Sequence, residues 1–191
     1  MSLRKKIGEK VFQDRVTQVA TQICSFVGSD EKVLDLGAGT CLFTKLLKER
    51  GYRVTPVDIQ NRSYYKHISS LVYDGEHLPF KSGKFDTCLL IAVLHHTPDP
   101  EVVLKEAMRV SNRLVILEET TTNIFQRYYT YIVDSFFNKD LAAPHTNKTD
   151  EEWRKLFKRL GLKLVKTTSK NNWLFIHNPM YFLERSKYAR N

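Results

Sequence analysis

The sequence predicts an α/β fold in which helices cover both faces of a mostly parallel β-sheet. Three observations support this prediction. Short apolar segments alternate with segments of helical periodicity over most of the 191 residues. The first apolar segment, 32–36, ends in a glycine-containing turn that leads into a helical pattern, and the second, 53–57, ends on Asp58. In such folds a ligand binds at the carboxyl ends of the strands, where the strand order reverses.

The individual elements follow from apolar periodicity and from the residues that start or stop each segment. We expect helices over 9–26, 41–50, 61–68 and 100–110, and strands over 32–36, 53–57, 70–73, 85–91 and 113–118. Pro98 and Pro100 hold the turn that starts the 100–110 helix, where a missing N–H group does no harm. Pro56 removes a donor within a strand, so we expect a bulge or a missing ladder bond there.

A second capped helix lies near the end of the chain. Thr149 and the acids 150–152 form a capping sequence before Trp153, and Gly161 ends the helix. Two apolar segments follow, 162–168 and 173–182, and we expect both to be strands.

The turn after the first strand has the features of a nucleoside site. Gly37 and Gly39 allow the backbone to turn sharply and to lie against a ligand. Asp58 follows Gly37 by 21 residues, a spacing that suits an acid accepting from two ribose hydroxyls. Leu42 stands where a dinucleotide fingerprint has its third glycine, which disfavours NAD and FAD. Asp35 does not help to bind a pyrophosphate but is compatible with a cationic amino-acid group.

Four ordered motifs extend this pattern: Leu34-Asp35-Leu36-Gly37-Ala38-Gly39-Thr40, Val57-Asp58, Asp74-Gly75-Glu76-His77-Leu78-Pro79-Phe80, and Phe85-Asp86 followed by Leu94-His95-His96. Together, over about residues 30–120, they resemble the class I S-adenosylmethionine-dependent methyltransferases, especially the small-molecule branch that includes quinone-biosynthesis C-methyltransferases. The resemblance implies a Rossmann-like, seven-stranded, mostly parallel sheet with an antiparallel C-terminal edge hairpin and helices on both faces. Cys41 departs from the pattern, because many relatives carry glycine there.

The resemblance also assigns roles to residues that would bind S-adenosyl-L-methionine. Those expected at its methionine end and sulfur are Asp35, Gly37, Ala38, Gly39, Ile91 and Ala92. Those expected at its ribose and adenine are Asp58, Ile59, Asp74 and Gly75. For Asp35 and Asp74 a purely structural role, as a helix cap or loop anchor, is the alternative.

His95 and His96 stand where a general base could act on the methyl acceptor. The alternative is packing at the cofactor pocket or bonding at the entry of the following helix. His145 is a second candidate base, with an exposed loop residue as its alternative. No group of His, Cys and carboxylates has metal-ligand spacing, so we expect no metal.

The segment from about 120 to 148 is the least family-like part of the chain. Residues 124–137 predict a helix that is apolar on more than one face. It would pack onto the domain or onto a second copy in a homo-oligomer, or form a lid whose aromatic face walls the acceptor pocket. Apart from this insertion, we expect residues 1–191 to form a single methyltransferase domain.

Composition excludes several classes of protein. The chain has no apolar run long enough to span a membrane and no secretory signal, and its three cysteines lie far apart, so we expect reduced thiols and a cytoplasmic location. The net charge is +9, with basic groups near 4–10, 154–166 and 185–190. These groups form a solvated face, or they attract an anionic membrane surface or RNA.

These patterns favour an enzyme that transfers the methyl group of S-adenosyl-L-methionine to a small organic acceptor, leaving S-adenosyl-L-homocysteine. The alternatives are a tRNA or rRNA methyltransferase that uses the basic surface, and a non-catalytic module that keeps the cofactor pocket. The fourth strand ends in Ile91-Ala92-Val93-Leu94 rather than in the N/D-P-P-Y/F motif of base-modifying relatives. An NAD-dependent oxidoreductase is the least favoured, because the turn lacks the third glycine.

Overall fold

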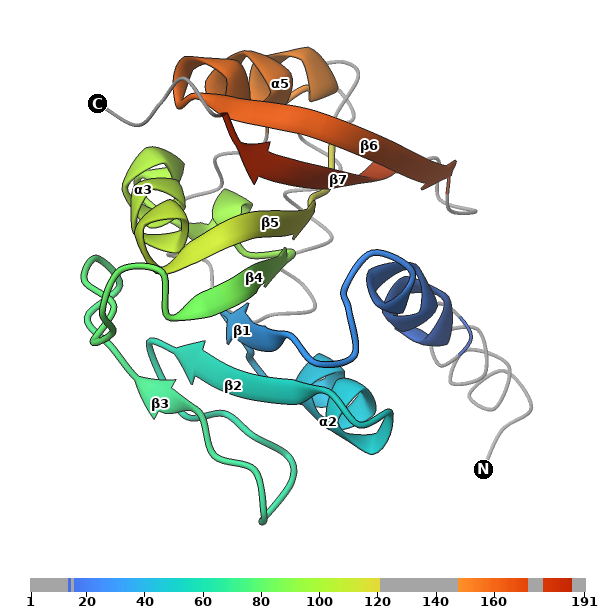
Figure 1. Ribbon diagram of the computed structural model, residues 1–191, viewed down its shortest axis with the longest axis vertical. Helices are drawn as coiled ribbons and strands as arrows, with labels where there is room; N and C mark the ends of the chain where they lie inside the picture. Colours follow the sequence, from blue (N-terminus) through green and yellow to red (C-terminus); the bar gives the residue numbers. More distant parts are fainter. Residues whose placement is uncertain (1–13, 15, 121–147, 172–176, 187–191) are drawn as a thin grey trace.

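The computed structural model describes residues 14, 16–120, 148–171 and 177–186. Seven strands form one sheet in the order β3-β2-β1-β4-β5-β7-β6 (Figure 1). The strands are β1 (Lys32–Leu36), β2 (Arg53–Asp58), β3 (Leu71–Val72), β4 (Phe85–Ile91), β5 (Ser111–Leu117), β6 (Leu162–Asn171) and β7 (His177–Arg185). The first five pair in parallel, and β7 is antiparallel to both β5 and β6. The predicted parallel sheet with an antiparallel C-terminal pair is confirmed.

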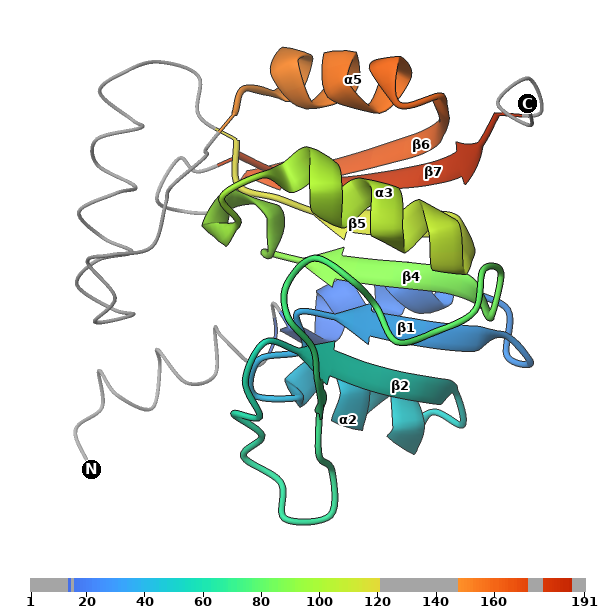
Figure 2. The same cartoon turned by 90° about the vertical axis from the view of Figure 1, so that its left-hand side faces the viewer.

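Helices cover both faces of this sheet (Figures 1 and 2). The 16–24 helix and α2 (Leu42–Glu49) pack on one face, and α3 (Pro100–Val110) and α5 (Asp150–Arg159) pack on the other. Neighbouring β1 residues serve different faces, since Val33 packs with Ile23 and Leu47, whereas Leu34 packs with the α3 and α5 side. The alternation is the one expected for a strand buried on both sides.

The helix starts follow their predicted caps. The Asp99 side chain accepts a hydrogen bond of 2.8 Å from the Glu101 N–H, with Pro100 in the first helical position of α3. At α5, the Thr149 hydroxyl accepts from the Glu152 N–H while the Glu152 carboxylate accepts from the Thr149 N–H. This reciprocal pair is the capping box that the sequence predicts.

One local prediction is wrong, and of the two alternatives expected at Pro56 the structure rules out the bulge. Residues 61–68 form turns rather than a helix, because the side chains of Asn61 and Ser63 bond nearby backbone and hydroxyl groups in place of a helical ladder. Pro56 causes no bulge, since the β1–β2 register continues from Lys32–Arg53 to Leu36–Val57. The expected missing ladder bond is tolerated, because on the side of β2 away from β1 the next strand, β3, pairs only with Val57 and Asp58 and not with Pro56.

The remaining differences concern boundaries. β3 is shorter than 70–73, β5 begins at Ser111 and β6 extends to Asn171. The predicted helix over 124–137 and nearly all of the 120–148 insertion lie outside the described residues, as do the basic residues 4–10. No helix in the described ranges combines the length and the apolar character needed to cross a membrane.

Candidate functional site

The turn after β1 is shaped by Gly37, which has a φ of +76°. Its N–H and that of Ala38 both donate to the Val57 carbonyl, at 2.8 and 3.1 Å, and so join the turn to β2. A Cβ on Gly37 would lie 2.5 and 2.8 Å from the two methyl groups of Val93, at the end of β4. Glycine is therefore required here both by the backbone angle and by the close approach of a neighbouring side chain.

Gly39 and Asp58 form the next contact of the turn. The Gly39 N–H donates to Asp58 Oδ2 at 2.7 Å, and the Gln60 N–H donates to Asp58 Oδ1 at 3.2 Å. A Cβ on Gly39 would meet none of the described residues within 4 Å, so among them this part of the turn faces open space. A carboxylate oxygen can accept more than one hydrogen bond, so Asp58 keeps acceptor capacity for a ligand.

An exposed apolar side chain lies beside that carboxylate. Ile59 is 54% exposed, and its Cγ2 is 3.5 Å from the Cβ position of Gly75, whose φ is +92°. Asp74 precedes Gly75 and accepts from the backbone N–H groups of His77 and Glu76, at 2.6 and 2.8 Å. These hydrogen bonds lower the pKa of Asp74 and hold the loop. Its predicted role at adenine stays a prediction.

Asp35 is buried at the end of β1, where the Thr44 hydroxyl of α2 donates to its carboxylate at 2.5 Å. Burial raises the pKa of Asp35 to about 6, although the Thr44 hydrogen bond acts in the opposite direction. The side chain therefore anchors α2 to β1, as the structural alternative for this residue expects. It also places a buried negative charge beneath the turn.

This buried charge predicts a measurable effect of Asp35→Asn. The folded protein holds the Asp35 proton more tightly than the unfolded chain, so the ionised carboxylate costs stability at neutral pH and the cost disappears as the pH falls from about 6 to 4. Asparagine still accepts from Thr44, so we expect the variant to be more stable by about 1–3 kcal/mol at pH 7.5. Urea unfolding at pH 7.5 and 4.5 measures the difference, which should shrink at the lower pH. A variant no more stable than the parent at pH 7.5 would contradict this reading.

The end of β4 carries backbone strain. Ala92 is exposed and has a φ of +56°, in the region that residues with a Cβ rarely adopt. Its N–H donates to the Leu117 carbonyl at 2.8 Å, which ties the end of β4 to the end of β5. Such strain clusters at functional sites and persists because surrounding contacts enforce it. Ile91, the last residue of β4, is half-buried beside it.

Glu118, directly after β5, fixes the segment that follows β4, a role that no motif in the sequence predicts. It is completely buried, and its Oε1 accepts from the backbone N–H groups of Val93 and Leu94 at 3.0 and 2.7 Å. Its Oε2 lies 2.6 Å from Nδ1 of His95. The only sequence signal was an acid immediately after a strand of buried apolar residues.

The two histidines differ in exposure. His95 is 2% exposed and lies against Glu118, a placement that suits the anchoring alternative. His96 is half-buried, and its ring centroid is 3.9 Å from that of His95. The general-base role of either histidine stays a prediction, and His145 lies outside the described residues.

Cys41 occupies a left-handed conformation, with a φ of +61°, at the start of α2. Glycine adopts this conformation readily, which explains why related sequences can carry glycine at this position. The side chain is buried, with its sulfur 3.2 Å from the Ser70 hydroxyl.

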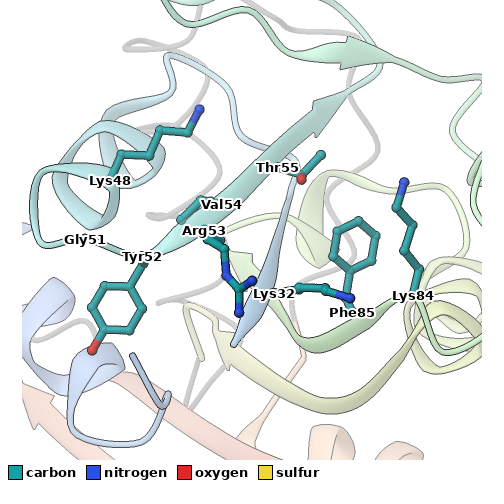
Figure 3. A pocket seen from close by; sticks show the side chains of 9 residues that line it. All are labelled: Lys32, Lys48, Gly51, Tyr52, Arg53, Val54, Thr55, Lys84 and Phe85. Atoms are coloured by element: carbon teal, nitrogen blue, oxygen red, sulfur yellow. The ribbon is translucent and has the colours of Figure 1, made fainter. Parts of the chain in front are cut away.

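The sheet brings the predicted residues to one edge, because they lie at or just after the carboxyl ends of the parallel strands β1, β2, β3 and β4. None of them lines the surface hollow of about 460 Å³ in Figure 3, which lies where β1, β2 and β4 begin. Among the described residues no group of three or more His, Cys, Asp or Glu side chains could hold a metal ion.

Comparisons with known proteins agree with this geometry. Residues 34–114 match the family model described as a methyltransferase domain. A demethylmenaquinone methyltransferase of Streptomyces griseus is 32% identical over 111 residues, which are 52% of this chain and 48% of the relative. Over these residues the chain is similar to class I methyltransferases. The chain spans about half the length of this relative and of similar demethylmenaquinone methyltransferases.

Two solved structures share the methyltransferase fold at low identity. A Burkholderia thailandensis 1,6-didemethyltoxoflavin-N1-methyltransferase, with that compound and S-adenosylhomocysteine bound, has a TM-score of 0.68 at 20% identity, covering 95% of this chain and 84% of its own. A Synechocystis magnesium protoporphyrin IX methyltransferase with bound S-adenosylhomocysteine has a TM-score of 0.69 at 17% identity, covering 97% and 88%.

Proposed function

We propose that this protein is a class I methyltransferase that transfers the methyl group of S-adenosyl-L-methionine to a small organic acceptor and releases S-adenosyl-L-homocysteine. The observation that carries the proposal is the joined unit of Gly37, Gly39 and Asp58. It presents a bare backbone turn to open space, with a carboxylate at its rim that retains acceptor capacity. A nucleoside with two ribose hydroxyls fits this combination.

The residues around that unit would hold the remaining parts of the cofactor. The exposed side chain of Ile59 offers an apolar surface for the adenine, next to Gly75. Gly37, Ala38 and Gly39 would line the methionine end, above the buried charge of Asp35. Ile91 and Ala92 would pass near the sulfur, at the strained end of β4.

The chemistry demands little of the side chains. When bound, the cofactor supplies an activated methyl group on a sulfonium. The protein then has to align the acceptor for an in-line displacement and to exclude water. His96 is the half-buried candidate for taking a proton from the acceptor.

Similarity to demethylmenaquinone methyltransferases supports an acceptor with a flat quinol ring. We place the reaction in the cytoplasm, because Cys24, Cys41 and Cys88 are free thiols. The test is incubation with the labelled methyl donor and a soluble, short-chain demethylnaphthoquinol, followed by detection of the methylated ring. Methylated product supports the proposal. Failure with this acceptor and with a panel of phenols, amines and acidic carbon compounds, by protein that binds the cofactor, would contradict it.

The ribose contact can be tested separately with Asp58→Asn. The amide still accepts one hydrogen bond but loses the charge, so affinity for S-adenosyl-L-homocysteine should fall by about 1–3 kcal/mol. Calorimetric titration measures the change, with Glu49→Gln, an exposed charge loss at the far end of α2, as the control. Equal affinities in both variants would remove Asp58 from the site.

A further inference from the structure

A surface hollow of about 460 Å³ lies at the edge of the sheet where β1, β2 and β4 begin, away from the glycine turn (Figure 3). Two buried apolar side chains, Val54 and Phe85, form part of its lining. The complete lining is Lys32, Lys48, Gly51, Tyr52, Arg53, Val54, Thr55, Lys84 and Phe85. It contains four cationic side chains and no carboxylate.

The four charges of this hollow are all positive and repel one another. Lys32 and Arg53 are direct partners in the parallel β1–β2 ladder, each at the first position of its strand. Like charges placed opposite each other in a sheet are destabilising. In the part of the chain that the structure describes, neither they nor Lys48 and Lys84 take part in an ion pair. On α5, by contrast, Arg154 and Lys155 each pair with an acid four residues earlier.

Nearby polar groups leave most of the donors available. The guanidinium of Arg53 gives one N–H to the Asp30 carbonyl, and a guanidinium has five N–H donors. The carboxylate of Asp86 accepts from the backbone N–H of Lys32 rather than from its ammonium. The Lys84 ammonium lies 4.3 Å from the centroid of the Phe80 ring, which restricts its position.

We propose that this hollow binds the phosphate groups of a small molecule, such as a diphosphate or triphosphate. Clustered, unpaired cations over an apolar floor create a positive potential that an anion of high charge density would neutralise. The volume lies within the range of small-molecule sites, roughly 300–1,000 Å³. A planar membrane surface fits a concave site poorly.

An extended nucleic acid is less favoured, because single strands are bound by rows of aromatic stacking platforms along a basic groove. The hydroxyl of Tyr52 is directed to the carbonyls of Cys24 and Val27, and Phe85 is buried. The aromatic side chains of the hollow are therefore engaged in the fold, and the cations remain as its available groups.

The experiment is a calorimetric titration of the full chain with tripolyphosphate at low salt. We expect one-to-one binding that weakens by about tenfold or more in the double variant Lys32→Gln/Arg53→Gln, the usual consequence of removing two charge-assisted contacts. The matched control is Lys158→Gln/Lys163→Gln, which removes the same charge from exposed positions of α5 and β6 and should change the affinity by less than about twofold. Thermal unfolding and S-adenosyl-L-homocysteine titration check that the hollow variant remains folded.

Absence of tripolyphosphate binding to the parent protein would overturn the proposal. So would an equal loss in the two double variants, which would show that net charge alone attracts the anion. A single-stranded oligoribonucleotide that binds at the same salt, and that tripolyphosphate does not displace, would also overturn it in favour of an extended nucleic-acid surface. Displacement by tripolyphosphate would support the compact site.

Discussion

Replacing Gly37 by alanine should destabilise the protein by about 2–5 kcal/mol and abolish cofactor binding. Two terms contribute. The φ of +76° is unfavourable for a residue with a Cβ, and the added methyl would lie 2.5 Å from a methyl group of Val93. Val93 has little freedom to move aside, because its side chain is β-branched and its backbone N–H is bonded to Glu118.

The matched control is Gly83→Ala. Gly83 has a similar φ of +68°, but a Cβ there would have no neighbour within 4 Å in the part of the chain that the structure describes. Both substitutions reduce the freedom of the unfolded chain alike. The difference between their free energies of unfolding, measured in urea, therefore isolates the contact with Val93. Val93→Ala should recover part of the loss in the Gly37→Ala background. Equal destabilisation by Gly37→Ala and Gly83→Ala would show that Val93 does not press on the turn.

Replacing Glu118 by alanine should cost about 3–5 kcal/mol, because it removes a buried carboxylate that binds one half-buried and two buried groups. These groups are the N–H groups of Val93 and Leu94 and the ring of His95. The loss would release the segment after β4 that contacts the glycine turn, so cofactor affinity should fall together with stability.

Glu118→Gln separates hydrogen bonding from charge. Its amide oxygen still accepts from both backbone N–H groups, and its NH₂ group suits a His95 tautomer with an unprotonated Nδ1. We expect this variant to retain most of the stability lost in Glu118→Ala. Glu151→Ala, which breaks only the exposed pair with Lys155, should be nearly neutral in the same urea unfolding experiment. Similar stabilities of Glu118→Ala and Glu151→Ala would contradict the anchoring role.

The parallel sheet, and the placement of the candidate site residues at one edge of it, were predictable because both follow from short-range patterns combined with one rule of topology. Apolar segments located β1, β2 and β4, and parallel strands place their carboxyl ends at one edge of the sheet. Asp58 therefore falls beside Gly39, as its spacing in the sequence predicts. The capping box at Thr149 was equally predictable, because it depends on four consecutive residues.

The features that were missed depend on tertiary contacts or on local competition. Glu118 is 24 residues from Leu94, and no sequence motif links the two. They meet because β5 pairs with β4 in the sheet. The 61–68 segment has some apolar spacing, but Asn61 and Ser63 form local hydrogen bonds that replace those of a short helix. The hollow lined by Lys32 and Arg53 arises only when two strands start in register.

The central claim is that the glycine turn and Asp58 hold one nucleoside, that of S-adenosyl-L-methionine. Calorimetric titration of the unaltered protein with S-adenosyl-L-homocysteine, and in parallel with NAD, tests it most directly. We predict one-to-one binding of S-adenosyl-L-homocysteine that excess NAD does not displace. Binding of NAD in its place, or no heat from S-adenosyl-L-homocysteine with a folded sample, would contradict the account.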